Sequence, residues 1–417
     1  MSTKSGLTKM EKRWVLYDIG NSAFIMMVST IIPIYFKNTA EAAGIDDAMS
    51  TAFWSYATSF CTIMVMILGP LLSTVADHGK RKKSMFMLFF FLGVIGCGCL
   101  SLPIGWIGFL GIFVLARLGY VCGNMFYDAM LTDITEDERM DMVSSQGYAW
   151  GYIGSCIPFV LCLLLILTAE TTGIGTQKAT MLSFLITALW WLLMTLPLLS
   201  NYRQRYAIGE GNDPLQLGKS VRHLGAVFQE IFRDKQIFYF LLAYFCYIDG
   251  VHTIIDMATV YGKDVGISDT NLLLALLLTQ LVAFPCVILF GRCTKRFSVK
   301  RIIGVCIFGY FFITLFALQL DKAWEFWFLA VCVAIFQGSI QALSRSYYAR
   351  LIPKEKSSEY FGFFDIFGKG AAFFGTMIIG VSTQITGNSK LGLVLLALLF
   401  LMGYLLLSFS EKKKTVA

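Results

Sequence analysis

The sequence has little charge for its length. Charged residues make up 15% of the 417 residues, and 57% are hydrophobic. Soluble domains carry about 25% charged residues, and no soluble fold can bury this much apolar surface. The mean hydropathy of +0.68 agrees with that conclusion. The chain is therefore predicted to be an all-α polytopic membrane protein.

Several patterns of catalytic and metal-binding proteins are also absent. There are three His, and no C-x-x-C pair, H-E-x-x-H or G-x-S-x-G occurs. The eleven Cys lie mostly within apolar runs, where Cys behaves as a small hydrophobe. We expect no enzyme activity, metal, cofactor or disulfide framework. The net charge of +7 does not indicate a nucleic-acid partner, because the basic residues lie in short loops between apolar runs.

Apolar windows of the length that crosses a bilayer, roughly 20 residues, recur along the whole chain. They predict twelve transmembrane helices in two six-helix bundles. The first six windows are 14–38, 51–76, 83–103, 105–131, 142–168 and 179–199. The second six are 236–262, 270–291, 299–320, 323–350, 357–386 and 389–409.

The Lys and Arg residues predict the orientation of these spans. Most of the 34 fall in alternate loops, which the positive-inside rule assigns to the cytoplasm. These loops also place both termini in the cytoplasm. The inner group includes Lys4, Lys9, Lys12, Arg13, 80–83, Arg139, 292–301, 350–356 and 412–414. The outer loops hold Lys37, Lys178, Lys263, Lys322 and Lys390.

One long connection divides the chain. Its position predicts an N-terminal bundle at 1–199, a cytoplasmic linker at 200–235 and a C-terminal bundle at 236–417. The second part of the linker places apolar residues on one helical face, which predicts an interfacial helix. These residues are Leu217, Val221, Leu224, Phe228, Ile231 and Phe232. A linker helix without lipid contact is the alternative.

A loop motif recurs at about half the chain length. At 69–83 an apolar run is followed by an acid, a glycine and four basic residues, and 291–301 repeats the pattern. Such a repeat indicates two related halves. The first copy resembles the best-known motif of the major facilitator superfamily through Asp77, Gly79, Lys80 and Arg81. The resemblance implies a cytoplasmic gate in which Asp77 acts at the start of the eleventh span; a basic anchor on anionic lipid is the alternative.

Further segments in both halves resemble one branch of that superfamily. The branch is the "unknown major facilitator" family, which includes the autophagy-related vacuolar amino-acid effluxers. The resemblance implies the major facilitator fold, transport by alternating access and an amino-acid substrate. The short chain favours a bacterial member. The matching segments are 17–24, 33–36, 124–129, 144–154, 247–253, 341–346, 351–354, 361–362 and Lys369.

Eight charged residues lie within the predicted spans. Each costs about 2.5–3.5 kcal/mol near the bilayer centre, so such residues are expected to face partners or a water-filled cavity. A structural ion pair is the competing explanation for each of them. They are Arg117, Arg345, Lys369, Asp18, Asp128, Asp249, Asp256 and Asp365.

The seventh span carries the densest polar pattern. Asp249, His252 and Asp256 are spaced i, i+3 and i+7, so they lie along one helical face. A His changes its charge near neutral pH, which suits a role in proton coupling or substrate binding. A polar stripe bonded to neighbouring helices is the alternative.

The internal repeat aligns the first span with the seventh. Asp18 and Asn21 then correspond to Asp249 and His252. The superfamily resemblance implies that spans one, four, seven and ten line a cavity, so Asp18 and Asn21 are candidate site residues. An ion pair of Asp18 with Arg345 or Lys369 is equally compatible with the sequence.

Arg117 lies in the middle of the fourth span. Its guanidinium can hold a substrate carboxylate through two hydrogen bonds, although Asp128 or another acid is an alternative partner. Asp365 and Lys369 are spaced i, i+4 and are expected to neutralise each other. The remaining candidates for substrate or proton contact are Tyr127, Gln341, Arg345 and Lys369.

The predicted function is secondary active transport of a small organic solute, with an amino acid or similar zwitterion favoured. We expect proton coupling, as symport or antiport, a monomer and a bacterial plasma membrane as its location. The partners are then the solute, a coupling ion and lipids. An exporter of amphipathic solutes is the alternative that 36 Phe and 18 Met suggest. A non-transporting receptor or assembly factor is the alternative of another class.

Overall fold

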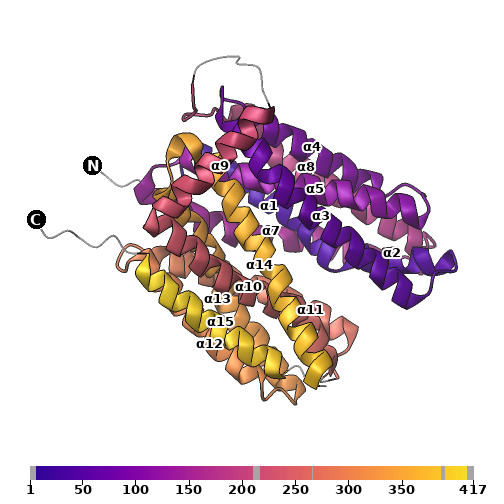
Figure 1. Ribbon diagram of the computed structural model, residues 1–417. Helices are drawn as coiled ribbons and strands as arrows, with labels where there is room; N and C mark the ends of the chain where they lie inside the picture. Colours follow the sequence, from indigo (N-terminus) through magenta and orange to yellow (C-terminus); the bar gives the residue numbers. More distant parts are fainter. Residues whose placement is uncertain (1–5, 210–216, 265, 387–389, 411–417) are drawn as a thin grey trace, which may run out of the picture. The chain divides into compact units, whose positions relative to one another are not determined.

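The computed structural model describes residues 6–209, 217–264, 266–386 and 390–410, and its elements are helices (Figure 1). The first group comprises α1 (Lys9–Ser29), α2 (Ile31–Ala42), α3 (Asp47–Asp77), α4 (Lys82–Cys99), α5 (Trp106–Ala129), α6 (Leu131–Ile134), η1 (Asp137–Arg139), α7 (Met140–Leu167) and α8 (Thr176–Asn201). The second comprises α9 (Leu217–Arg233), α10 (Lys235–Asp264), α11 (Asp269–Cys293), α12 (Val299–Ala317), α13 (Ala323–Leu351), η2 (Lys354–Lys356), α14 (Ser357–Thr386) and α15 (Lys390–Phe409). Lys4, the basic residues 412–414 and the linker segment 210–216 lie outside the described residues.

The helices confirm the predicted fold class. In the described part of the chain, eleven helices are long and apolar enough to cross a membrane, with residues 9–42 counted as one. The predicted span 357–386 corresponds to α14, which is 30 residues long and is not among those eleven. Eleven of the twelve predicted windows thus coincide with one long helix each, and the first window coincides with α1 and α2 together.

The first predicted span is divided into two helices. α1 ends at Ser29, and Thr30 adopts φ −133° and ψ −76°, outside the helical region. Pro33 lies in the first turn of α2. Proline has no N–H, and its ring clashes with the carbonyl four residues earlier, so it favours a break at this point. The N-terminal end of α1 is fixed by a capping box between Thr8 and Glu11.

The chain divides into two compact units. Unit 1 consists of Met1–Ile134 and Trp150–Pro214, and unit 2 consists of Thr135–Ala149 and Leu215–Ala417. Residues 135–149 therefore belong to unit 2, although the sequence prediction placed them in the N-terminal bundle. Helix α7 begins in one unit and continues into the other.

Unit 1 has an aromatic centre on α8. Trp191 is fully buried. The centroid of its ring lies 5.3 Å from the ring centroid of Phe24, 5.9 Å from that of Phe90 and 6.0 Å from that of Tyr120. Aromatic pairs at such separations stabilise a core beyond the area that they bury. One side chain therefore connects α1, α4, α5 and α8.

Helices α4 and α5 approach each other at glycines. A Cβ added to Gly119 would lie 2.3 Å from the Gly93 nitrogen and 2.7 Å from the Phe89 oxygen. A Cβ added to Gly96 would lie 2.8 Å from that of Ala116. Small residues of this kind let backbones pack closely, which is how membrane helices associate.

Replacing Gly119 with Ala is expected to destabilise the protein by about 1–3 kcal/mol, because the new methyl group meets backbone atoms that cannot rotate away. Gly111→Ala on the same helix is the matched control, since a Cβ there meets nothing within 4 Å. Unfolding in detergent should show a lower midpoint for Gly119→Ala and an unchanged or slightly higher one for Gly111→Ala. Equal midpoints would contradict the packing described for α4 and α5.

Unit 2 is built around α10, which packs against α13, α14 and α15. The Tyr247 hydroxyl lies 2.6 Å from the Ser344 hydroxyl of α13. A Cβ at Gly250 would lie 2.4 Å from the ring of Phe400 on α15. Figure 1 shows α10, α14 and α15 running side by side. Neighbouring helices therefore enclose α10 around Tyr247 and Gly250.

The linker helix forms as predicted and attaches to η2 and α14. Lys356 lies 2.7 Å from the Glu230 carboxylate, and the rings of Phe228 and Phe363 are 5.8 Å apart. Phe228 is also exposed, whereas the side chains of 217–223 lie outside the described ones. Lipid contact by α9 remains a prediction.

Candidate functional site

The predicted gate loop is a tight turn between α3 and α4. Gly79 has φ +63°, and Lys80 has φ +59°. Lys80 is the one non-glycine residue with positive φ in the described part of the chain. Left-handed backbone costs a residue with a Cβ roughly 1–2 kcal/mol, so the surrounding contacts must hold this turn in place.

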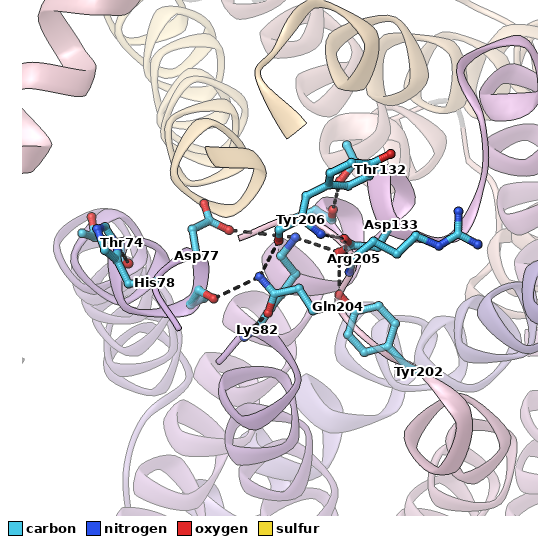
Figure 2. A network of polar contacts seen from close by, with 12 residues as sticks. Thr74, Asp77, His78, Lys82, Thr132, Asp133, Tyr202, Gln204, Arg205 and Tyr206 are labelled. Atoms are coloured by element: carbon cyan, nitrogen blue, oxygen red, sulfur yellow. Dashed lines mark hydrogen bonds and ion pairs between the residues drawn. The ribbon is translucent and has the colours of Figure 1, made fainter. Parts of the chain in front are cut away.

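Asp133 in α6 holds the gate loop in place through its contact with Lys82 (Figure 2). Its Oδ2 accepts hydrogen bonds from the Lys82 ammonium at 2.9 Å and the Tyr202 hydroxyl at 2.6 Å. Its Oδ1 accepts from the backbone N–H groups of Arg205 at 2.9 Å and Tyr206 at 3.1 Å. Both carboxylate oxygens thus receive two donors, which compensates for the loss of water around a buried charge.

The same cluster ties the start of the linker to the gate loop. The Asp77 carboxylate lies 3.9 Å from the Lys82 ammonium, and both side chains are fully buried. The Ile208 N–H donates to the Asp77 carbonyl at 2.8 Å. The Gln204 side chain accepts a hydrogen bond from the Lys82 N–H at 3.0 Å. We call Asp77, Lys82, Asp133, Tyr202 and Gln204 the Asp133 cluster.

Electrostatics keep Tyr202 as a donor. Burial, together with the negative charge of Asp133, raises the pKa of the Tyr202 hydroxyl well above its usual range. The hydroxyl therefore stays protonated at any physiological pH and donates to Asp133.

The sequence found part of this cluster. It named four residues of the loop, Asp77, Gly79, Lys80 and Arg81. Lys80 is exposed and Arg81 is half-buried, and Lys82 is the fully buried basic residue. Asp133 was missed; the one signal for it is that a buried Lys needs an acid nearby. A gating role of the loop remains a prediction.

In unit 1, the candidates on the first span meet α5. The Asn124 Oδ1 accepts hydrogen bonds from the Tyr17 hydroxyl and the Asn21 amide, both at 2.9 Å. Tyr127 is engaged with Trp14: each side chain donates to the other's backbone carbonyl, and the rings stack at 4.4 Å. Asn124 was not among the predicted site residues, although it opens the family-like segment 124–129.

Two acids of unit 1 lie near this network. Asp18 is buried and Asp128 is half-buried, and the charge of each acts on both Tyr17 and Tyr120. The structure thus brings Asp18, Asn21 and Asp128 to the same group of tyrosines.

Arg117 is half-buried in α5. Its guanidinium carbon lies 6.0 Å from the ring centroid of Phe113, and its charge acts on Tyr120. In the described part of the chain, no carboxylate forms an ion pair with Arg117. A guanidinium within a membrane helix therefore has its five donors available.

In unit 2, Asp249 is the most deeply placed acid of α10. It is 1% exposed, and its Oδ1 accepts the Gly375 N–H of α14 at 2.8 Å. A Cβ at Gly375 would lie 2.6 Å from that oxygen and 2.1 Å from the Thr253 hydroxyl. Glycine is required where the α14 backbone approaches the carboxylate this closely. Gly375 was not foreseen from the sequence.

His252 and Asp256, which lie on the same face of α10 as Asp249, have different surroundings. His252 is half-buried and faces the backbone of Gly368 and the charge of Lys369, while Asp256 is exposed. Lys369 forms an ion pair with Asp365 one turn away, as the i, i+4 spacing predicted. Lys369 thus has an acid of its own helix as partner.

Arg345 contacts the first turns of α7, within unit 2. Its Nε donates to the Ser144 hydroxyl at 2.9 Å, and its guanidinium carbon lies 4.5 Å from the ring centroid of Tyr148. Arg345 is 2% exposed, whereas Gln341 on the same helix is half-buried. Ser144 opens the family-like segment 144–154 and Tyr148 lies within it, so the resemblance was the available signal for both residues.

Arg350, which follows Arg345 on α13, forms an ion pair with Asp141 of α7. The Arg350 guanidinium holds both oxygens of Asp141 at 2.8 Å, and the Ser346 hydroxyl donates to Asp141 at 2.6 Å. Bidentate pairs of this kind fix orientation as well as charge. Neither Asp141 nor Arg350 was a predicted site residue.

In the described part of the chain, the long apolar helices with charged residues within them define a class, that of the polytopic membrane proteins. Among solved structures, the chain is similar to the crystal structure of a major facilitator superfamily transporter, FucP, in the outward conformation. The match covers 97% of this chain and 98% of that one, with a TM-score of 0.73 and 13% identity. Because the two sequences are only 13% identical, this similarity shows the fold alone.

Sequence relatives identify the family. The family model described as "Vacuole effluxer Atg22 like" matches residues 131–417. The uncharacterized MFS-type transporter YxiO of Bacillus subtilis (strain 168) is 42% identical over 407 residues, which are 96% of this chain and 95% of that relative. The chain therefore belongs to the Atg22-like family, and it is a multi-pass membrane transporter of the major facilitator type.

The fungal members are longer and more distant. Autophagy-related protein 22-1 of Aspergillus niger is 25% identical over 282 residues, which are 62% of this chain. The match covers 45% of that relative, so this chain spans about half of its length. The predicted family is confirmed, and a bacterial member fits the strongest of these matches.

Proposed function

We propose that the protein is a secondary active transporter that moves an amino acid or similar zwitterion by alternating access, driven by a proton gradient. The observation that carries the proposal is the half-buried Arg117 with no carboxylate partner in the described residues. Both termini lie in the cytoplasm, and the monomer is the working unit. The membrane is the bacterial plasma membrane.

The case for a carboxylate-bearing substrate starts from the free-energy cost of placing the Arg117 charge inside the bilayer. A charge in the bilayer interior costs about 2.5–3.5 kcal/mol, and an anion that binds it recovers part of that cost. A guanidinium forms two parallel hydrogen bonds with a carboxylate, which favours an organic acid group over a monatomic anion. The charge of Arg117 acts on Tyr120, and the charges of Asp18 and Asp128 act on the same tyrosine.

Groups whose negative charge or oxygen can attract an ammonium group lie in the same unit. The Asp18 and Asp128 carboxylates and the Asn124 amide oxygen lie around Tyr17. An amino acid carries one anionic and one cationic group, so it suits a set with one guanidinium and two carboxylates. A receptor without transport activity would need its membrane charges to pair internally, and Arg117 does not fit that expectation.

Proton coupling is assigned to Asp249 of unit 2. A carboxyl group can bind and release a proton, and this one is buried with a backbone N–H as its donor. No cation forms an ion pair with it in the part of the chain that the structure describes. It is therefore free to exchange charge with a proton.

Uptake into proteoliposomes tests the function. A panel of labelled amino acids is offered with and without an imposed pH gradient, and we expect saturable uptake that the gradient enhances. If none of the panel moves while the protein remains folded, the amino-acid substrate is wrong.

The Arg117→Gln variant tests the site in the same assay. Loss of a charged hydrogen-bonding partner costs about 1.5–3 kcal/mol of binding free energy. We therefore expect the uptake rate at low substrate concentration to fall by about 10- to 150-fold. Arg296→Gln, in an exposed loop, is the matched control and should transport normally. An unchanged apparent affinity in Arg117→Gln would remove Arg117 from the substrate site.

A further inference from the structure

A buried threonine lies beside the acid to which proton coupling is assigned. Thr253 follows Asp249 by four residues in α10, so the two side chains lie on the same helical face. Thr253 is fully buried, and Asp249 is nearly so. A hydroxyl group and a carboxyl group thus share one enclosed stretch of α10.

Both side chains approach the same point of α14. A Cβ added to Gly375 would lie 2.1 Å from the Thr253 hydroxyl oxygen and 2.6 Å from the Asp249 Oδ1. The Gly375 N–H already donates to this Oδ1 at 2.8 Å. The carboxyl group and the hydroxyl group therefore converge on one backbone position of the neighbouring helix.

The Thr253 hydroxyl is not engaged in this arrangement. It has no hydrogen-bond partner among the residues that the structure describes. Two other threonines of unit 2, Thr279 and Thr314, each donate to a carbonyl of their own helix, at 2.7 Å and 2.8 Å. A buried hydroxyl without a partner disfavours the folded state. The geometry therefore favours a bond that Thr253 makes when its neighbour changes charge.

A hydroxyl group can serve both charge states of a carboxyl group. It donates its proton to an ionised carboxylate, and after rotation about its C–O bond it accepts the proton of a neutral carboxylic acid. A proton from the aqueous phase bonds to a carboxylate oxygen and neutralises it, and release of that proton restores the charge. The Gly375 N–H is a donor alone, so it cannot accept the proton of the neutral acid.

The charged and titratable groups near this face have other roles. Lys369 of α14 pairs with Asp365, and its charge acts on His252, which faces the Gly368 backbone. The Cys246 thiol, one turn before the acid, interacts with the charge of Asp249 but is a weak hydrogen-bond donor. The Thr253 hydroxyl is a better partner than the thiol, because it both donates and accepts strongly.

We propose that Thr253 positions the coupling proton, by bonding to the Asp249 carboxyl group in both of its charge states. It donates to the ionised carboxylate and accepts from the neutral acid, so the proton is held at one place and in one orientation. This inference rests on the proposed coupling at Asp249. It adds a group that takes part in coupling without changing its own charge.

Infrared difference spectra test the contact without any transport. The purified full chain in lipid is compared at high and low pH, and the carbonyl stretch of neutral Asp249 is the band that Asp249→Asn abolishes. Thr253→Val should shift this band to higher frequency, because a hydrogen bond is lost, and Thr253→Ser should leave it in place. Thr314→Val is the matched control, since it is the same change at a buried Thr that bonds its own helix, and it should not move the band.

Gradient-driven uptake gives the second readout. Thr253→Val should reduce uptake several-fold, and Thr253→Ser should restore it. The unfolding midpoint of Thr253→Val should be unchanged or higher, because the hydroxyl that it removes is buried without a partner in the described residues. A lower midpoint with an unmoved band would mean that Thr253 acts only in packing.

The spectra distinguish failure of this inference from failure of the proposed function. A band that is present but unmoved in Thr253→Val overturns the role of Thr253 and leaves coupling at Asp249 intact. If Asp249→Asn removes no band at any pH, Asp249 takes up no proton, and both the coupling and the role of Thr253 are wrong.

Discussion

The Asp249→Asn variant is expected to lose gradient-driven uptake while remaining folded. Asparagine has the same shape and its oxygen can still accept the Gly375 N–H, so the contact between α10 and α14 is retained. The amide cannot bind or release a proton, so a proton gradient can no longer drive the cycle. Uptake in proteoliposomes with an imposed pH gradient should fall at least tenfold, to the level without a gradient.

Two further variants sharpen this result. Asp321→Asn, the same change at an exposed position, should behave as the unaltered protein. Gly375→Ala places a methyl group 2.6 Å from the Asp249 oxygen and should reduce uptake without changing any titratable group. Normal, pH-dependent uptake by Asp249→Asn would mean that the coupling proton is carried elsewhere.

The Asp133→Ala variant is expected to destabilise unit 1 more than any other change considered. It leaves the buried Lys82 ammonium with Asp77 at 3.9 Å, and it removes the acceptor of Tyr202, Arg205 and Tyr206. Removing one partner of a buried ion pair costs about 3–5 kcal/mol. Chemical unfolding in detergent should report a loss of that size.

The controls for this prediction come from the same segment and the same pair. Glu138→Ala removes an exposed acid five residues away and should change stability by at most about 0.5 kcal/mol. The double variant Lys82→Met with Asp133→Leu removes both charges together, so it should be more stable than Asp133→Ala alone. If Asp133→Ala unfolds like Glu138→Ala, the cluster does not support the fold.

The sequence predicted the features that depend on local spacing. Hydropathy found the twelve spans, and the i, i+4 spacing predicted the Asp365–Lys369 pair. The break after α1 at Thr30 was not predicted, because the hydropathy of 14–38 is continuous. Gly79 was named through the motif resemblance, and its positive φ is one that a glycine adopts without strain.

Features that depend on distant partners were not predictable. The donors to Asp133 come from Lys82, 51 residues earlier, and from residues 69–73 positions later. The donor to Asp249 is a backbone N–H 126 residues away, which no side-chain pattern marks. Arg117 was found because its charge is visible in the sequence, but only the fold shows that no carboxylate among the described residues pairs with it.

The Asp133 cluster also sets the order in which unit 1 can be completed during biosynthesis. Lys82 and Asp133 are synthesised long before Tyr202, Gln204, Arg205 and Tyr206, which supply most of the remaining bonds. A nascent chain that stops at Asn201, the last residue of α8, has all the N-terminal helices but lacks these donors. An N-terminal half-protein expressed on its own therefore needs to extend through Ile208, whose backbone N–H donates to the Asp77 carbonyl and closes the cluster.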